Sequence, residues 1–254
     1  PVTNPVFHHP GEGLSRVRLG EVLEVHGPEA RHAVTVRRLR AGEPLDLVDG
    51  HGTRATCTFR DGEKDRMTVA VESLESEPQP RPLLTLVQAL AKGERDLQAV
   101  ESATELGVSR VVPWQAERSS VRLRAERAAK TMGKWESLLA TAAKQSRRAT
   151  WPELAPWVDT AGLAELIRSE PGTLWLVLHE SANVPWSSRE VAAWGEQEHV
   201  AVVVGPEGGI SERELEALCA AGARPVRLGA TVMRSSTAGP AALAALSAVL
   251  GLWD

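Results

Sequence analysis

The sequence predicts an α/β protein in which a small β-rich domain precedes a larger domain built around a mostly parallel sheet. Three observations lead to this prediction. Short alternating strands occupy residues 14–75, three prolines interrupt residues 78–82, and apolar strands then alternate with helical segments. A chain of 254 residues can bury a sizeable core, so one or two domains are expected.

The composition excludes several classes of protein. Hydrophobic residues make up 43% and charged residues 24%, which is typical of a soluble globular protein and not of a disordered chain. There is no tyrosine, so no tyrosine can act as a catalytic acid. The two cysteines, Cys57 and Cys219, are far apart and have no CxxC partner, which excludes a disulfide framework or zinc ribbon and favours a reducing, cytoplasmic setting.

The first domain, residues 1–77, is expected to be a barrel-like β module. Four candidate strands cover residues 17–25, 45–48, 55–59 and 67–71. Apolar and polar side chains alternate in the last two, as they do in half-buried strands. Turns are expected at Asp49-Gly50 and Asp61-Gly62, and a short helix is expected within residues 28–39.

The linker is expected at residues 78–82, because its prolines cannot continue a helix or a central strand. The second domain, residues 83–254, carries five candidate strands at 83–90, 108–112, 174–178, 200–204 and 226–228. Their continuous apolar runs are typical of strands buried on both faces. They alternate with helical patterns, which predicts a parallel sheet.

Four helices are expected in the second domain. They cover residues 97–106, 128–142, 212–221 and 240–252. Gly107 is placed as a C-terminal cap, and Ser211 with Glu214 forms a capping box before a helix that Gly222 ends. The last helix is nearly all apolar, so it is buried either in the core or against another subunit.

Charge is unevenly distributed along the chain. The formal net charge of −4 argues against a nucleic-acid partner only if the charges are evenly spread. Residues 81–148 hold 13 basic and 7 acidic side chains, whereas the segments on either side are acidic. This basic block predicts either a surface that contacts RNA phosphates or a solvated helix face.

Two glycine-rich loops follow candidate strands. Residues 205–211 read GPEGGIS, which is neither a GxGxxG nor a Walker sequence, and residues 228–240 contain Arg234 among glycine, serine and threonine. In open α/β sheets, ligands bind at the carboxyl ends of strands, so these loops could form one pocket with residues 178–180. The alternatives are a tight turn without a ligand and an Arg234 that pairs with a carboxylate or points to water.

Four ordered motifs resemble one known family over essentially the whole chain. They read ATELGV at residues 103–108, ERS at 117–119, KQSR at 144–147, and GPEGGISERE followed by LGATVMRSSTA at 205–214 and 228–238. These motifs are similar to those of the 16S ribosomal RNA uracil-N3 methyltransferases of the RsmE type, in the SPOUT superfamily. The N-terminal module resembles that family's PUA-like RNA-binding domain.

The resemblance implies a SPOUT trefoil-knot methyltransferase domain preceded by a small PUA-like β-barrel domain. It implies methylation of uridine N3 in small-subunit ribosomal RNA, with S-adenosylmethionine as cofactor. The implied partners are a second copy of the chain, in a homodimer, and the small ribosomal subunit; no membrane partner is expected. Arg234 is the candidate catalytic residue. The implied cofactor-binding residues are Leu178, His179, Glu180, Gly205, Pro206, Glu207, Gly208, Gly209, Leu228, Gly229, Met233, Arg234, Ser236 and Thr237.

The family match favours RNA contact by part of the basic block. The candidate RNA-binding residues are Arg118, Ser119, Arg122, Lys144, Gln145, Arg147 and Arg148. No metal is expected, because no ligand cluster with zinc-like spacing accompanies the N-terminal histidines.

The sequence departs from the family pattern at two positions. Ser236 stands where many members have Glu, which leaves no obvious general base other than Glu207, a water or a group of the other subunit. Ser102 stands where many members have Lys. A different SPOUT reaction, such as ribose 2′-O-methylation, and a non-catalytic RNA-binding or ribosome-assembly factor stay open as alternatives.

Overall fold

The computed structural model describes residues 4–9, 13–123 and 125–253, and the chain divides into two compact units. Unit 1 contains Pro1–Gln79 and Ala143–Trp151, and unit 2 contains Pro80–Ala142 and Pro152–Asp254. The chain therefore passes from the first unit to the second near the proline-rich segment, and later returns to the first unit for nine residues.

Unit 1 is built on a five-stranded sheet with the order β1-β3-β4-β5-β2. The strands are β1 (Val6–His8), β2 (Val22–His26), β3 (Pro44–Val48), β4 (Thr53–Glu63) and β5 (Arg66–Ser76). β1 pairs with β3 in parallel and the other neighbours are antiparallel. A helical segment, α1 (Pro28–Arg31) continued by η2 (His32–Val36), packs against the sheet through Ala30 and Ala33.

Two details of unit 1 differ from the sequence predictions. The strand expected at 17–25 begins only at Val22, because a 3₁₀ turn, η1 (Leu14–Arg16), and a turn at Gly20 come before it. The hairpin turn falls at Lys64-Asp65 and not at Asp61-Gly62, since Glu63 still pairs with Arg66. Lys64 adopts the left-handed conformation that closes this turn (φ 54°).

The segment Ala143–Trp151 is held in unit 1 by backbone and side-chain contacts. Trp151 N donates to Gly50 O at 2.9 Å, and Gly52 N donates to Ala149 O at 3.1 Å. The Trp151 ring lies 4.2 Å from the His8 ring, centroid to centroid. These contacts join residues more than ninety positions apart, so no local pattern in the sequence predicts them.

Unit 2 is built on a seven-stranded sheet in which each paired strand is parallel to its neighbour. The strand order is β12-β10-β11-β6-β7-β8, with β9 also paired to β7. The strands are β6 (Leu83–Ala89), β7 (Arg110–Gln115), β8 (Glu153–Leu154), β9 (Val158–Asp159), β10 (Thr173–Leu178), β11 (His199–Val204) and β12 (Arg224–Val226). The predicted parallel sheet is confirmed.

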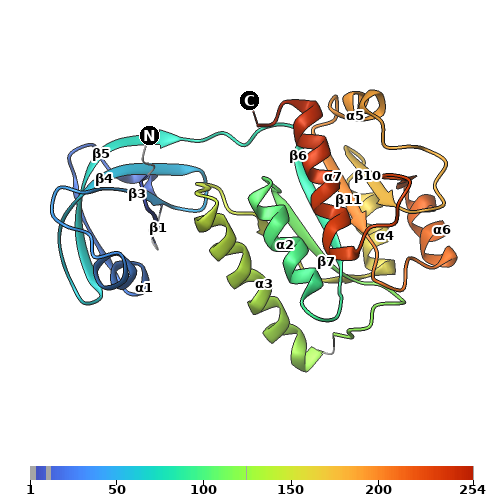
Figure 1. The fold of residues 1–254 in the computed structure, drawn as a ribbon, viewed down its shortest axis with the longest axis horizontal. Coiled ribbons are helices and arrows are strands. Elements are labelled where there is room, and N and C mark those ends of the chain that lie inside the picture. Colours follow the sequence, from blue (N-terminus) through green and yellow to red (C-terminus); the bar gives the residue numbers. More distant parts are fainter. Residues whose placement is uncertain (1–3, 10–12, 124, 254) are drawn as a thin grey trace. The chain divides into compact units, whose positions relative to one another are not determined.

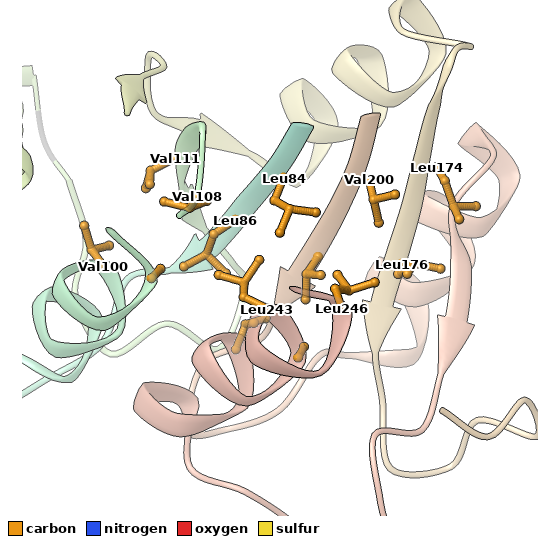
Figure 2. Close-up of a cluster of buried hydrophobic side chains, with 14 of the residues drawn as sticks. Leu84, Leu86, Val100, Val108, Val111, Leu174, Leu176, Val200, Leu243 and Leu246 are labelled. Carbon is orange, nitrogen blue, oxygen red and sulfur yellow. The ribbon is translucent and has the colours of Figure 1, made fainter. Parts of the chain in front are cut away.

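Both faces of this sheet are covered by helices. Leu84 and Leu86 of β6 belong to the core shared with α2 (Arg95–Glu105), α3 (Ala125–Gln145), α5 (Ser188–Trp194) and α7 (Ser235–Leu250). Figure 2 shows them with Val100 of α2 and with Leu243 and Leu246 of α7. Val87 and Ala89 of the same strand face the second core, shared with α4 (Thr160–Ser169) and α6 (Glu212–Ala221). Alternate residues thus enter opposite cores, which explains the continuous apolar runs.

The C-terminal helix α7 lies across β6 and β11 (Figure 1), and its Leu243 and Leu246 are fully buried there. The core of one chain therefore accounts for the apolar composition of this helix. The helix was expected to begin at Pro240, but it begins at Ser235, so that Pro240 lies inside it. Sequence analysis also missed the short strands β1, β8 and β9 and the helices α4 and α5.

No helix in the described part of the chain is both long enough and apolar enough to cross a membrane. Within the same residues, no three His, Cys, Asp or Glu side chains gather in an arrangement that could hold a metal ion.

Two helical glycines of unit 2 test the packing of its core. A Cβ at Gly239 in α7 would lie 2.8 Å from Leu86 Cδ1, whereas a Cβ at Gly133 in α3 would meet nothing within 4 Å. Both Gly→Ala changes gain about 1 kcal/mol of helix propensity. We expect overpacking of about 1–3 kcal/mol to outweigh this gain only at Gly239. Urea unfolding should therefore show a lower midpoint for Gly239→Ala and a higher one for Gly133→Ala; equal shifts would contradict the packing.

Candidate active site

Two adjoining cavities lie at the carboxyl ends of the parallel strands of unit 2. The first, of about 510 Å³, is bounded by the turn after β10, by Trp186 and by the segment after β12. The second, of about 600 Å³, is bounded by the same turn, by the glycine loop after β11 and by the start of α7. The two share six lining residues, Leu178, His179, Glu180, Val232, Met233 and Ala238. The pocket was expected at the carboxyl ends of the strands, and both cavities lie there.

Most of the residues expected to bind a cofactor line these cavities. Twelve of the fourteen do so: Leu178, His179, Glu180, Gly205, Pro206, Glu207, Gly208, Gly209, Leu228, Gly229, Met233 and Arg234. Ser236 and Thr237 stand in the first turn of α7, outside the described walls of both cavities. This difference arises because α7 begins at Ser235, so residues 236–237 belong to the helix and not to the loop that borders the cavities. Sequence reasoning had placed both in a loop.

The glycine loop is tightly packed against its surroundings. A Cβ at Gly205 would lie 2.6 Å from Ile210 Cγ1, and a Cβ at Gly208 would lie 3.0 Å from Arg118 Cβ. Gly209 adopts a left-handed conformation (φ 73°), which most side chains disfavour. The loop therefore requires glycine for close approach and for turning, whether or not a ligand is bound.

The segment between β12 and α7 contains backbone N–H groups without a hydrogen-bond partner in the described part of the chain. Among the described residues, the N–H groups of residues 228–234 donate no hydrogen bond, whereas Arg227 N donates to Val184 O at 2.8 Å. The chain beyond residue 227 thus offers a run of backbone donors beside both cavities. Sequence patterns did not reveal this, since backbone pairing depends on the neighbouring segment.

Arg234 lies at the start of α7, where its carbonyl accepts hydrogen bonds from Thr237 N and Ala238 N. Its side chain is exposed and lines the 600 Å³ cavity. Within the described part of the chain its guanidinium forms no ion pair. The cation is therefore available to a ligand in the cavity.

Arg118 contributes to the same cavity from the loop after β7. Its Nη1 donates to Gly208 O at 3.1 Å. Of the two other RNA candidates of this loop, Ser119 is buried and its hydroxyl accepts a hydrogen bond from Ala116 N, whereas Arg122 is exposed and donates to Glu117 O. Arg118 and Arg122 can therefore reach a ligand directly, and Ser119 instead shapes the loop.

The other four RNA candidates belong to unit 1. Lys144 Nζ forms an ion pair with Glu29 Oε1 at 2.6 Å, and burial lowers the pKa of Arg148 to about 10. Gln145 and Arg147 are exposed. Lys144 is thus already neutralised by a carboxylate of its own unit, a pairing that a basic run in the sequence does not reveal.

A buried carboxylate fixes the Arg118 loop relative to the glycine loop. Glu214 is 3% exposed. Its carboxylate accepts hydrogen bonds from Ser211 N at 3.1 Å, from Glu117 N at 2.7 Å and from the Thr160 hydroxyl at 2.6 Å. These donors belong to three different segments of unit 2, so one side chain joins the loop after β7 to the starts of α4 and α6.

Glu117 completes this network on the surface side. Its Oε2 accepts a hydrogen bond from the Ser211 hydroxyl at 2.7 Å, and its Oε1 lies 3.2 Å from Arg213 Nη2. The hydrogen bond from Ser211 is the main reason why the pKa of Glu117 is lowered. The capping box predicted from Ser211 and Glu214 is confirmed, and the structure adds its connection to residues 116–119.

Sequence reasoning missed several lining residues. The main ones are Arg95, Pro185, Trp186, Arg227, Ser235 and Ala238. Trp186 packs edge-on against Trp194 at a centroid distance of 4.9 Å. The motif at 228–238 includes some of these residues, but nothing local distinguishes Trp186 from a core tryptophan.

Replacing Glu214 by Gln tests the buried network. The amide nitrogen cannot accept a hydrogen bond, so at least one of the donors from Ser211, Glu117 or Thr160 loses its partner. We expect the free energy of unfolding to fall by about 1–3 kcal/mol. The matched control is Glu212→Gln, which removes the same charge at an exposed position of the same helix turn. Urea unfolding midpoints that fall equally in both variants would contradict the role of Glu214.

Known protein families and relatives resemble this chain over most of its length. The profile of the RNA methyltransferase domain matches residues 77–247, and that of the RNA methyltransferase PUA domain matches residues 25–72. The chain is 41% identical over 237 residues to the ribosomal RNA small subunit methyltransferase E of Mycobacterium bovis, covering 92% of this chain and 89% of that protein. It is 28% identical over 231 residues to the protein of the same name from Bacillus subtilis, covering 89% of each.

Solved structures give the same result. The ribosomal RNA small subunit methyltransferase E of Neisseria gonorrhoeae, bound to S-adenosyl methionine, superimposes with a TM-score of 0.84 at 27% identity, covering 97% of this chain and 98% of that one. A Legionella pneumophila protein in complex with SAM superimposes with a TM-score of 0.83 at 31% identity, with the same coverage. The chain therefore belongs to the RNA methyltransferase family, and within it to the ribosomal RNA small subunit methyltransferase E type.

Proposed function

We propose that this protein methylates N3 of a uridine in the 16S ribosomal RNA of the small ribosomal subunit, with S-adenosylmethionine as methyl donor. The observation that carries this proposal is the meeting of three segments around two cavities: residues 178–180, 205–209 and 228–234. The names of its relatives support small-subunit ribosomal RNA as the substrate, and the SAM-bound neighbours support the cofactor.

The residues around the cavities fit S-adenosylmethionine. Two buried polar atoms in their walls, Trp186 Nε1 and Ser235 Oγ, have no hydrogen-bond partner among the described residues. Together with the backbone N–H groups of 228–234, they suit a ligand rich in hydrogen-bond acceptors. Leu178 and Leu228 supply the apolar wall that an adenine ring requires. The volumes, about 510 and 600 Å³, are in the range of ligand pockets.

The chemistry assigns a role to Arg234. When bound, S-adenosylmethionine supplies an electrophilic methyl group attached to a positively charged sulfur. Uracil N3 becomes nucleophilic only after losing its proton, and the resulting negative charge spreads onto the ring oxygens. The unpaired guanidinium of Arg234 in the cavity wall is placed to stabilise that charge. Holding the base close to the cofactor supplies a further part of the acceleration.

Two carboxylates line the same cavity as Arg234 and are the candidates to accept the N3 proton. Glu207 forms an ion pair with Arg95 at 3.1 Å, and Glu180 is exposed at the border of the two cavities. Ser236, at the position where the family often has Glu, carries no carboxylate. Residue 236 therefore cannot accept the N3 proton as a carboxylate in this protein, and another group must do so.

The course of the chain after β12 supports the trefoil knot implied by the resemblance. Trp186 N donates to Arg227 O at 2.8 Å and Arg227 N donates to Val184 O at 2.8 Å. Residues 184–186 thus run beside residue 227 before the chain turns back toward α7, which packs over β11 and β6. Such a close return of the chain past an earlier segment is compatible with the proposed knot.

The protein is also proposed to act as a homodimer. Val232 is 78% exposed and Met233 is 38% exposed, although both are apolar and line the cavities. A second chain that covers them would remove this apolar surface from water. Sedimentation equilibrium should give twice the chain mass of 27.3 kDa, and a single-chain mass at micromolar concentration would contradict the dimer.

The reaction itself is tested by nucleoside analysis. We expect the purified protein, incubated with S-adenosylmethionine and small subunits that lack the modification, to produce 3-methyluridine detectable by mass spectrometry of the digested 16S RNA. 2′-O-methylated nucleoside would instead support a ribose methyltransferase. Tight cofactor binding by calorimetry without any methylated product would support a non-catalytic factor.

In the same assay, Arg234→Ala should lower kcat by about 10²–10³-fold, because a preorganised cation near the developing oxyanion is lost. Cofactor binding should stay largely intact. Arg189→Ala is the matched control, since it removes an exposed arginine on α5 outside the described cavity walls. Wild-type turnover in Arg234→Ala would contradict its assigned role.

A further inference from the structure

A third cavity, of about 490 Å³, adjoins the glycine loop at Glu207 and Gly208. Its charged lining residues are Lys92, Arg95, Arg118 and Glu207. Arg95, Arg118 and Glu207 also line the 600 Å³ cavity, whereas Lys92 lines only the third one among the three cavities. The third cavity thus extends the proposed active site and adds one positive side chain, Lys92, to it.

The turn between β6 and α2 places Lys92 in this position. Gly93 and Glu94 both adopt left-handed backbone conformations, with φ of 63° and 60°. For a residue with a side chain such as Glu94, this conformation costs about 1–3 kcal/mol, and such residues cluster at binding sites. The sharp turn leaves Lys92 exposed immediately before α2.

The two arginines of this cavity are held in place by the glycine loop. Arg95 Nη1 lies 3.1 Å from Glu207 Oε1, and Arg118 Nη1 donates to Gly208 O at 3.1 Å. A guanidinium has five N–H donors, so each arginine keeps donors for a further ligand. Anchoring through one donor limits the side-chain entropy that such a ligand must overcome.

The charge of this cavity favours an anion. Three positive side chains face one carboxylate, Glu207, along its wall. Glu94 of the turn is exposed and lies outside the described wall of this cavity. Asp96 of α2 is buried, and its carboxylate accepts hydrogen bonds from Ala91 N at 3.3 Å and from Leu97 N at 2.9 Å. Burial raises the pKa of Asp96.

We propose that Lys92, Arg95 and Arg118 form a subsite for a backbone phosphate of the RNA, next to the nucleotide that is methylated. This inference rests on the proposed function, because it assigns part of the RNA substrate to this cavity. A nucleotide whose base enters the 600 Å³ cavity carries phosphates on both sides. The adjoining positive cavity can bind one of them, with arginine forks and a lysine point charge as donors.

The carboxylate of the cofactor is also an anion that arginine and lysine side chains can bind. Lys92 distinguishes a bound RNA phosphate from a bound cofactor carboxylate. Because Lys92 lies outside the described walls of both proposed cofactor cavities, its replacement should affect RNA and leave the cofactor unaffected. Arg95 and Arg118 are less suitable for this test, since they line the shared wall.

The experiment compares Lys92→Met with the wild type in binding to 16S ribosomal RNA over a range of salt concentrations. Losing one phosphate contact should reduce the slope of log affinity against log salt by about 0.7–0.9, and affinity at low salt should fall several-fold. Lys92→Arg should restore the slope. Calorimetry should show unchanged affinity for S-adenosylmethionine. Lys134→Met is the matched control, an exposed lysine on α3 outside the cavities, and should keep the wild-type slope.

Three results would overturn the subsite. They are a Lys92→Met slope equal to that of Lys134→Met, a weaker affinity for S-adenosylmethionine with an unchanged RNA slope, and an absence of RNA binding by the wild type. Failure of the proposed function has a different signature, in which the wild type binds RNA but forms no methylated nucleoside. The slope of Lys92→Met still decides the subsite in that case.

Discussion

Parallel pairing of the strands in unit 2 is the constraint on which the proposed active site depends. Because β6, β7, β10, β11 and β12 run in one direction, their carboxyl ends meet at one edge of the sheet. The loops that leave these ends come from positions between 90 and 234 in the chain, yet they surround adjoining cavities. Helices on both faces leave this edge open for ligands.

Polar contacts then set the loops relative to one another. The buried carboxylate of Glu214 binds donors from three segments, and it holds the Arg118 loop beside the glycine loop. Glycine at positions 205 and 208 allows the close approach that this arrangement needs. The cavity walls thus carry two kinds of donor. We assign the Ser235 hydroxyl and backbone N–H groups to the proposed cofactor, and the arginine side chains to the proposed RNA.

The arginine side chains at this edge of the sheet differ in whether they are already paired. Arg234 has no ion-pair partner among the described residues, whereas Arg95 is paired with Glu207 and Arg118 with a carbonyl. A free cation can respond to charge that forms during a reaction, and anchored cations are suited to hold a charge that is already present. In unit 1, Lys144 is neutralised by Glu29, so the basic run of the sequence does not translate directly into a basic surface.

Local periodicity, turn residues and short motifs were enough to predict the parallel α/β class, the β-rich first unit, the glycine loop, the capping box and the family. Twelve of the fourteen residues that the resemblance implies for the cofactor line the cavities. Three features became visible only in the folded chain: residues 143–151 join unit 1, α7 begins at Ser235, and Trp186 and Arg95 line the cavities. The physical reason is that these features depend on contacts between segments far apart in the chain, such as Gly52 with Ala149 and Arg95 with Glu207, which no local pattern encodes.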